Sequence, residues 1–449
     1  MFMAWVKWRG NAQRDGHQGA YCSHPLGKFT VIAGLYLSLF LLVTWHSGHL
    51  RLLGDETIFF YASSDAAGYK QLADYTVSLG TTERPSEYLL KHRDFLFPLY
   101  LSTYHLIGVG GVQLLQIAMN VVSLWLVFIA LEITTRRLWL AIVGSTLLAV
   151  TPSFTFLAFY ALTETVSLLI IALFAMLMVL HFRYNRSYYL PIAVGLLSLL
   201  VCIRPIVLPF WIIVTVCYLF IWRRNQKVPS WQAALMVSPV FCQLLFSFLM
   251  TGSPAVASVG SVAFESWFFP AVYQAQEYGQ FEGRKSPQAL EGLRRFPEFS
   301  DKVIYMMQNL RATAKTYLSL LFGEHLTAGS NFVKTGTGTD NERGTLLSAT
   351  LRWSVRLNQT FLCLHVIALV GVLVLMVSGN SLLIGPISLL LYLFTLFLIL
   401  PAGLAYMQGD RYILLAEPLW LIAHGALLAR LLDTVFKPVR AIPVFVSSR

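Results

Sequence analysis

The stretch 63-Ser-Ser-Asp-Ala-Ala-Gly-Tyr-Lys-Gln-Leu-Ala-Asp-Tyr-75 is the part of the chain around which the predicted fold is organised. It is acidic and aromatic, and it follows the first long apolar run. Asp65 precedes Tyr69 and Leu72-Ala73 at helical spacing, and Gly80 follows as a stop signal. The pattern predicts an amphipathic helix on the outer leaflet of a membrane, with the Asp65 carboxylate at or before its first turn.

The whole chain is far more apolar than a soluble protein. Hydrophobic residues make up 56% of its 449 residues and charged residues 12%, and the mean hydropathy is +0.64. Soluble domains carry about 25% charged residues, so the composition indicates an all-helical, multi-pass membrane protein. The formal net charge is +11. The basic residues form short clusters between apolar runs, which is typical of topology signals and not of nucleic-acid binding.

Apolar runs that suit the roughly 17–25 residues of a membrane span recur along the chain. They cover 29–47, 112–133, 138–156, 158–181, 189–203, 206–222, 231–252, 359–378, 381–401 and 411–432. We therefore expect about ten transmembrane helices. A shorter run, 95–108, contains Pro98, Tyr100, Tyr104 and His105, which favours a juxtamembrane or re-entrant helix. Counting that run as a span would give about eleven.

The basic clusters determine the predicted orientation. With the N-terminal tail in the cytoplasm and 95–108 not spanning, the clusters at 136–137, 183–186, 223–227 and 437–449 all lie inside. The predicted organisation is a cytoplasmic tail (1–28), a transmembrane core (29–252) with a first outer loop (48–111), a partly helical outer segment (253–358), C-terminal transmembrane helices (359–432) and a second cytoplasmic tail (433–449). The five cysteines show no CxxC spacing, so we expect neither a zinc site nor a disulfide framework.

Acidic residues gather at the predicted outer boundary. Asp55, Glu56 and Asp65 lie just beyond the first span, and Glu164 lies in the outer hairpin between the third and fourth spans. Charges at a membrane span are costly, so each one requires a reason. By spacing alone, Asp65 can be a helix cap, and Glu164 can be explained by a favourable interaction with a helix dipole. These structural alternatives stay open beside a catalytic role.

Two arginines are predicted at the same boundary. Arg204, flanked by apolar residues, requires an anionic partner unless its head group reaches water. Arg411, which is followed by Tyr412, begins the last span and can be explained by pairing with a carboxylate. Arginine stays charged and binds phosphate in a bidentate manner, so this boundary suits chemistry on an anionic, lipid-linked substrate. His92 and Arg93 of the first outer loop are further candidates.

Short motifs follow one another along the chain in a set order. They are Asp65 with Tyr69 and Leu72-Ala73, Pro98-Leu99-Tyr100, Leu106-Ile107-Gly108, Arg136-Arg137-Leu138, Pro152-Ser153, Thr163-Glu164, Arg204-Pro205, Asp410-Arg411-Tyr412 and Glu417-Pro418. In this order they resemble the GT-C superfamily of integral membrane glycosyltransferases. The closer resemblance is to the bacterial branch related to aminoarabinose lipid A transferases and protein O-mannosyltransferases. It covers about 29–210 and 410–420, and it does not include 253–358.

The resemblance implies a GT-C-like fold, a location in the cell and a class of substrate. The location is the bacterial inner membrane, with both termini cytoplasmic and a periplasmic active site. The donor is a polyprenyl-phosphate-linked sugar, and the acceptor is a hydroxyl of a lipid, an envelope glycan or a protein. A single displacement would invert the anomeric centre. The sequence identifies no cofactor, and it leaves open whether a divalent metal takes part.

The resemblance also implies a catalytic role for Asp65. The reaction requires a general base and a cationic site for the departing phosphate. We expect Asp65 to be the base and Glu164 a second carboxylate that orients the acceptor or a metal, and we expect the ligands of the donor phosphate to be Arg204, Arg411 and Tyr412. We expect the remaining substrate contacts from Tyr69, His92 and Arg93.

Many relatives carry a second acid directly after the first, where this chain has Ala66. Asp55 and Glu56 are therefore the alternative catalytic acids.

Two other classes of function compete with a glycosyltransferase. A transporter or flippase of a lipid-linked substrate would place charges near the middle of the membrane and often shows two related halves. A polysaccharide polymerase or ligase would place its active site in 253–358, and Asp65 would then be dispensable. The clustering of charges at one boundary favours the glycosyltransferase.

Overall fold

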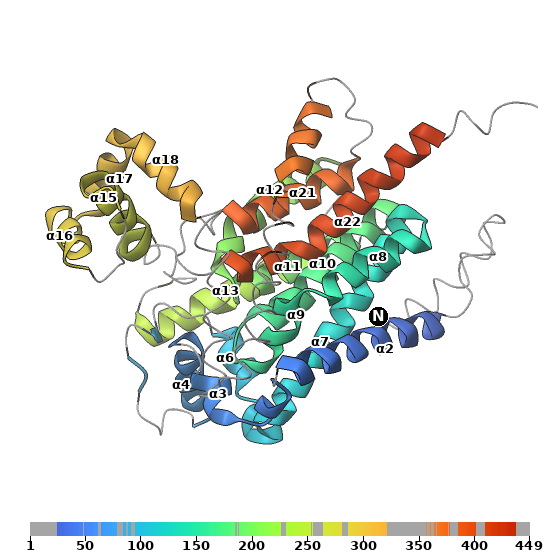
Figure 1. Ribbon diagram of the computed structural model, residues 1–449, viewed down its shortest axis with the longest axis horizontal. Coiled ribbons are helices and arrows are strands. Elements are labelled where there is room, and N and C mark those ends of the chain that lie inside the picture. Colours follow the sequence, from blue (N-terminus) through green and yellow to red (C-terminus); the bar gives the residue numbers. More distant parts are fainter. Residues whose placement is uncertain are drawn as a thin grey trace, which may run out of the picture.

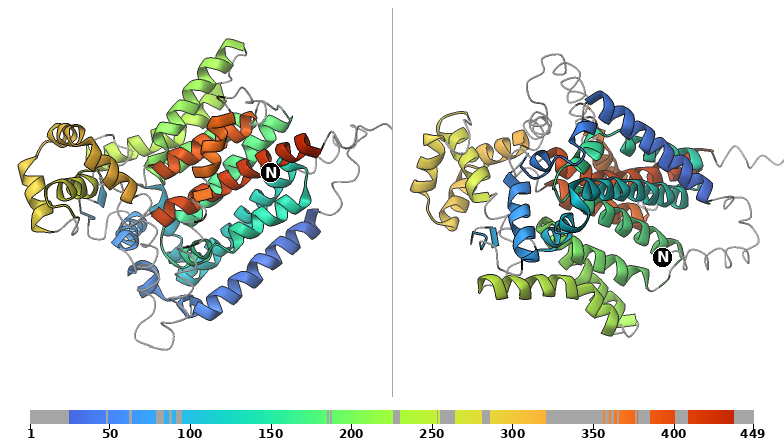
Figure 2. Two further views of the ribbon diagram at one scale, coloured as in Figure 1. Left: turned by 45° about the horizontal axis from the view of Figure 1, so that its top comes forward. Right: turned by 90° about the horizontal axis from the view of Figure 1, so that it is seen from below.

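The computed structural model describes the chain in separate segments. The main ones are 25–47, 49–61, 64–78, 95–184, 188–225, 230–252, 264–280, 286–320, 366–375, 385–400 and 409–436, with a few shorter pieces between them. Every regular element in these segments is a helix, as expected from the composition (Figure 1). The long helices form one bundle, and a group of short helices lies to one side of it in every view (Figures 1 and 2).

Five described helices are long and apolar enough to cross a membrane. They are α2 (Pro25–Ser47), α7 (Tyr104–Thr135), α10 (Glu164–Tyr184), α13 (Ser230–Thr251) and α22 (Gly409–Phe436). A bent pair, α8 (Leu138–Ala149) with α9 (Pro152–Phe156), makes up to six spans if it counts as one. The chain is thus a membrane protein, but fewer described helices meet the length criterion than the ten runs predicted from the sequence.

The remaining apolar helices of the bundle are shorter. They are α11 (Tyr189–Val201), α12 (Leu208–Asn225), a helix at 366–375 and α21 (Pro386–Ile399). Proline explains two of their boundaries. The residue before a proline is disfavoured in the helical region, and α11 gives way to the turn η3 (Pro205–Val207) at Arg204-Pro205. Pro386 stands in the first turn of α21, where its missing N–H has no cost.

The short apolar run 95–108 forms α6 (Leu96–Leu101) and the first turn of α7. Gly108 has φ +70° and ψ 169°, so it interrupts the helix directly after that turn. Glycine adopts such a conformation without a steric penalty. The run therefore precedes the span that begins near residue 109, and it does not form a span of its own.

Ion pairs mark one end of the bundle, which we call the Lys28 end. Lys28 at the start of α2 binds Glu132 near the end of α7. Arg137, just before α8, lies 2.9 Å from Asp433 near the end of α22. These pairs show that α2 and α8 run antiparallel to α7 and α22. At the opposite end, α2 finishes and α7 begins beside three short helices, η1 (His49–Leu52), α3 (Glu56–Tyr61) and α4 (Ser64–Val77) (Figure 1). We call this the α4 end.

Amide side chains of α7 hold the irregular backbone near the α4 end. Gln113 donates hydrogen bonds to the carbonyls of Leu52 and Phe159, both at 3.1 Å, and accepts one from the N–H of Gly54 at 2.7 Å. Asn120 donates to the carbonyl of Phe154 at 2.7 Å. Backbone groups in an apolar environment must be hydrogen-bonded within the protein. These amides therefore permit the break between α9 and α10 and join it to the loop before α3.

The group of short helices has a hydrophobic core of its own. It contains η4 (Phe264–Phe268), α15 (Phe269–Glu277), α16 (Pro287–Arg295), α17 (Phe299–Gln308) and α18 (Leu310–Ser319). Phe269, Tyr273 and Tyr305 are buried at its centre. The hydroxyl of Tyr317 donates to the carbonyl of Leu400 at 2.6 Å, which ties α18 to the end of α21.

Candidate functional site at the α4 end of the bundle

Asp65 lies in the first turn of α4, as the spacing around it predicts. Its side chain is half-buried. The helix is fixed by its apolar face, on which Ala66, Tyr69 and Ala73 are buried. The Tyr69 ring packs edge-to-face on the Phe97 ring of α6, with centroids 4.8 Å apart. Tyr69 therefore positions α4, and Asp65 is held at the beginning of a well-anchored helix.

Asp55 and Glu56 have different surroundings, although they are neighbours in sequence. The Asp55 carboxylate accepts a hydrogen bond from the N–H of Ile58 at 3.1 Å, so Asp55 caps the N-terminus of α3. The side chain of Glu56 is 58% exposed and lies 3.8 Å from the ammonium of Lys70. Of these two alternative acids, Asp55 caps α3, and Glu56 lies near the Lys70 ammonium of α4.

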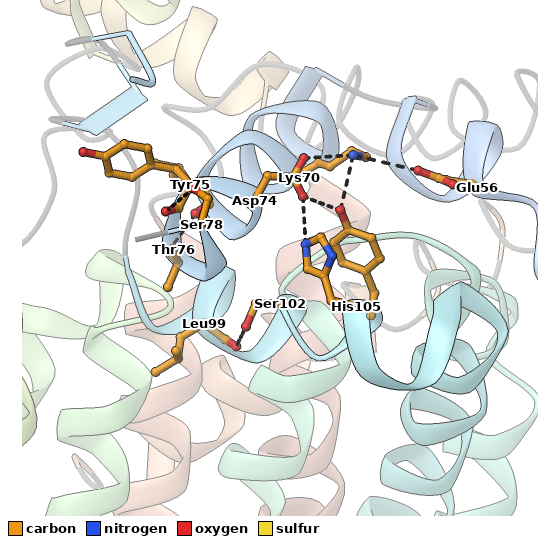
Figure 3. Close-up of polar contacts among 11 residues, drawn as sticks. Glu56, Lys70, Asp74, Tyr75, Thr76, Ser78, Leu99, Ser102 and His105 are labelled. Carbon is orange, nitrogen blue, oxygen red and sulfur yellow. Dashed lines mark hydrogen bonds and ion pairs between the residues drawn. The ribbon is translucent and has the colours of Figure 1, made fainter. Parts of the chain in front are cut away.

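A compact polar network joins α4 to the start of α7 (Figure 3). Asp74 accepts hydrogen bonds from Lys70 at 2.9 Å and from the Tyr104 hydroxyl, and His105 Nε2 lies 3.1 Å from the same carboxylate. Lys70 also donates to Tyr104 at 3.3 Å. Figure 3 shows the Lys70 ammonium between Asp74 and Glu56. Sequence reasoning missed this network because its members come from two separate segments.

The network changes the pKa values of its charged members on α4. Burial alone would raise the pKa of Asp74, but the hydrogen bonds from Tyr104 and Lys70 outweigh it, so the pKa lies below its ordinary value. Burial alone would lower the pKa of Lys70, but the hydrogen bonds with Asp74 and Tyr104 outweigh it and the pKa is raised. Both residues are therefore charged at neutral pH, and together they hold α4 against α7.

Glu164 and Arg204 form a buried ion pair. Arg204 Nη2 donates to Glu164 Oε1, and the side chains are 0% and 9% exposed for the glutamate and the arginine. Glu164 begins α10, and Arg204 precedes the η3 turn. Residues from two separate hairpins thus meet, and the anionic partner that Arg204 was expected to need is Glu164.

Backbone contacts place this ion pair near α3. The N–H of Ala161, three residues before Glu164, donates to the carbonyl of Phe59 in α3 at 3.0 Å. Gln113 of α7 bonds both Phe159 and the backbone just before Asp55. The structure therefore gathers Asp55, Glu56 and the Glu164–Arg204 pair at the α4 end, while Asp65 stands on the helix that packs beside them.

The other predicted site residues cannot be placed with their side chains. His92 and Arg93 lie outside the described residues. Arg411 and Tyr412 belong to the first turn of α22, but their side chains are likewise outside the described part. Among the described residues there is no group of three His, Cys, Asp or Glu side chains that would hold a metal ion.

Sequence reasoning assigned no role to Glu417, which is fully buried in α22. Thr151, at the break between α8 and α9, is its polar neighbour. Neither carboxylate oxygen of Glu417 reaches good hydrogen-bond geometry with a partner in the described part of the chain. Two turns further along the same face, His424 Nδ1 lies 3.0 Å from the Tyr392 hydroxyl. An acidic residue in a run as apolar as α22 was the available signal.

Comparisons with known proteins gave one structural likeness to report. No protein-family description matches the sequence, and no curated protein matches it. A solved structure that resembles the chain is the crystal structure of ArnT from Cupriavidus metallidurans bound to undecaprenyl phosphate. The two chains are 12% identical, the alignment covers 90% of this chain and 78% of the other, and the TM-score is 0.35. At that TM-score the likeness assigns neither fold nor function.

Proposed function

We propose that the chain is a membrane glycosyltransferase that moves a sugar from a polyprenyl-phosphate-linked donor to an acceptor hydroxyl of a lipid, an envelope glycan or a protein. The observation that carries this proposal is the buried Glu164–Arg204 pair at the α4 end of an apolar bundle. A guanidinium held there is positioned to meet an anionic group on a lipid. Asp65 supplies a carboxylate at the same end of the molecule.

In this proposal Glu164 orients Arg204 toward the donor phosphate. A carboxylate that accepts from one nitrogen of a guanidinium fixes its plane, because the guanidinium presents its donors in a rigid fork. Arg411 and Tyr412 are proposed as further phosphate ligands at the start of α22. Tyr69 sets the position of α4, and we propose that His92 and Arg93 bind substrate from the first outer loop.

The proposed reaction is a single displacement at the anomeric carbon. The acceptor oxygen attacks that carbon and its proton passes to the Asp65 carboxylate, while the bond between the carbon and the phosphate oxygen breaks. The electron pair leaves with polyprenyl phosphate, whose added negative charge is stabilised by Arg204 and Arg411. Preorganised charges in a water-poor site are often the largest contribution to such catalysis. This geometry inverts the configuration of the sugar.

We also propose a topology for the whole chain. If the bent pair α8–α9 and the shorter apolar helices each cross the membrane, the chain makes about ten passes. The Lys28 end then faces the cytoplasm, because basic clusters remain inside. The α4 end and the 253–358 segment face the periplasm of a bacterial inner membrane, and both termini are cytoplasmic.

A transfer assay with paired variants tests the assignment. Purified protein in vesicles is given a radiolabelled polyprenyl-phosphate sugar, and loss of label from the donor is measured. We expect Asp65→Asn to lower the rate by about 10²–10⁴-fold, the usual contribution of a general base. Asp55→Ala should retain transfer and lose about 1 kcal/mol of stability through the helix cap.

The same assay separates the alternatives. Wild-type rates in Asp65→Asn together with a large loss in Glu56→Gln would move the catalytic acid to Glu56. Wild-type rates in both variants would reject this carboxylate site and favour an active site in 253–358, as in a polymerase or ligase. The Asp65→Asn and Glu56→Gln variants must first show the wild-type unfolding temperature.

A specific observation supports a transporter or flippase as the second candidate. Glu417 is buried and His424 is half-buried within the candidate span of α22, and ionisable groups at membrane depth often mark a transport path. If the chain is a flippase, a fluorescent lipid-phosphate probe would cross vesicle membranes in the presence of the protein, and no sugar would leave the labelled donor. Glu417→Leu would then abolish that crossing.

A further inference from the structure

A row of large apolar side chains is exposed on two helices of the group beside the bundle. Ile304 and Met307 of α17 are 53% and 63% exposed, and Leu310 and Leu318 of α18 are 59% and 50% exposed. Ala314, between the last two, is also exposed. Spacings of three and four residues place them on one face of each helix. We call these five residues the α17–α18 stripe.

The stripe does not serve the core of its own group. That core is filled from the other faces of the helices, where Tyr305 and Met306 of α17 are buried beside Phe269 of α15. Thr316 of α18 is buried as well. Large apolar side chains that recur on an exposed helix face are candidates for contact with a partner or a membrane.

Basic residues accompany the apolar row. Arg311 and Lys315 directly follow Leu310 and Ala314, and both are exposed. The sequence of α18, Leu-Arg-Ala-Thr-Ala-Lys-Thr-Tyr-Leu-Ser, contains no acidic residue. An apolar face bordered by cations is the pattern of helices that lie in the headgroup region of a bilayer, where cations attract anionic lipids.

The end of α18 is anchored where the bundle itself exposes apolar side chains. The Tyr317 hydroxyl binds the carbonyl of Leu400, the residue that follows α21, at 2.6 Å. The Leu400 side chain is 48% exposed. The other end of α21 lies toward the Lys28 end, because Gly385 contacts the Arg430 guanidinium of α22. Tyr317, the residue before Leu318, thus anchors α18 on the side of the α4 end.

We infer that the α17–α18 stripe is seated in the headgroup and upper acyl region of the leaflet at the α4 end, with Arg311 and Lys315 on anionic lipid headgroups. The occupant of this surface is the bilayer itself. The inference rests on exposure, charge and the Leu400 anchor, and it is independent of the proposed sugar transfer. It gives the group of short helices a fixed depth relative to the bundle.

Depth-dependent fluorescence quenching tests the inference. Leu310→Cys and, as matched control, Arg294→Cys on the exposed polar side of α16 are made in a chain whose native cysteines are replaced. Each is labelled with bimane and reconstituted in vesicles that contain phosphatidylglycerol. We expect lipids brominated near the headgroup to quench most of the emission at 310 and little at 294. Aqueous iodide should show the reverse order.

Two results would overturn the inference. One is equal quenching by iodide at 310 and 294 with no effect of brominated lipid. The other is protection of 310 from both quenchers, because a protein surface would then cover the stripe. Folding is checked by an unchanged unfolding temperature.

A charge variant tests the role of the basic residues. The substitutions Arg311→Gln and Lys315→Gln, combined with the 310 label, should reduce brominated-lipid quenching in vesicles that contain phosphatidylglycerol and leave it unchanged in phosphatidylcholine vesicles. An equal reduction in both lipids would contradict the proposed contact with anionic headgroups.

Discussion

The ion pair between Glu164 and Arg204 combines a large desolvation cost with a large electrostatic attraction. Removing both charges from water is costly, and their mutual attraction offsets that cost only while both are present. The carboxylate is fully buried and the guanidinium nearly so. Loss of one partner therefore leaves an uncompensated charge in an apolar setting, whereas loss of both leaves none.

A double-mutant cycle tests this arrangement. We expect Arg204→Met to lower the free energy of unfolding by about 3–5 kcal/mol, and Glu164→Leu combined with Arg204→Met to restore most of it. The control is Arg137→Met at the exposed pair with Asp433, where the change should be about 0–1 kcal/mol. Unfolding is followed in detergent by tryptophan fluorescence.

Activity separates a structural pair from a functional one. If the pair serves only stability, the restored double variant transfers sugar normally. If Arg204 binds the donor phosphate, the double variant is stable and inactive, which is the outcome we expect.

The Asp74 network has a defined dependence on pH. The folded pKa of Asp74 is below its unfolded value, so its stabilising effect is complete above about pH 4 and is lost as the pH falls through the folded value. The raised pKa of Lys70 has the opposite sign, so its effect is complete below about pH 10 and is lost as the pH rises beyond it. The charges of Asp74 and Lys70 are therefore constant through the neutral range.

The free energy of unfolding, measured as the pH is lowered, tests the predicted loss of the Asp74 contribution. The wild type should lose about 1 kcal/mol more than Asp74→Asn between pH 5 and pH 3, a value kept small because solvent screens partly exposed groups. The stability curves of the two proteins should run parallel between pH 8 and pH 9. Parallel curves below pH 5 would show that the Asp74 charge contributes nothing to folding.

At the scale of elements, α7 organises its neighbours through polar side chains buried on an apolar helix. Gln113 alone satisfies backbone groups before α3 and at the end of η2 (Leu157–Phe159). Asn120 does the same for α9. The bent α8–α9 pair and the loop before α3 therefore receive part of their hydrogen bonds from the same helix.

Replacing Gln113 should be much more damaging than replacing its neighbour. We expect Gln113→Leu to cost about 2–4 kcal/mol, because the Gly54 N–H and the Phe159 carbonyl lose their partner and the Leu52 carbonyl keeps only the N–H of Asp55. The control Leu114→Ala changes a side chain that is 56% exposed, and it should cost less than about 1 kcal/mol. Equal unfolding midpoints in denaturant for the two variants would contradict this account.

Apolar periodicity and length were enough to predict the long helices, because a span requires one uninterrupted run. They did not predict where α8 bends or why α7 begins before Gly108, because those features depend on φ > 0 at one glycine and on amide contacts from another helix. The Asp65 helix was predicted correctly because its start, apolar face and end are all local signals.

The site was less accessible to sequence reasoning. The partner of Arg204 lies 40 residues away, and a single sequence carries no record of such pairings. The sequence around Asp74, Tyr104 and His105 shows no motif. Their network forms only because α4 packs against the start of α7. The catalytic role of Asp65 remains a prediction, because the described contacts fix its helix and not its chemistry.

At the scale of the whole molecule, the alternation of helix directions predicts which residues an aqueous reagent can modify from each side of the membrane. A membrane-impermeant maleimide added to intact cells should modify Arg294→Cys in α16, whose side chain is exposed. It should modify Asp433→Cys near the end of α22 only after the membrane is permeabilised. Labelling is compared with the unsubstituted chain, which contains native cysteines. The opposite pattern would invert the proposed topology.

The distance along the chain between Glu164 and Arg204 also has a consequence for biosynthesis. At about 5–20 residues per second, synthesis of the 40 residues between them takes about 2–8 seconds. During that time α10 has left the ribosome with its carboxylate and without the guanidinium that compensates it. We expect α10 to stay beside the insertion machinery until the Arg204 turn emerges, so that the two hairpins enter the bilayer as one unit.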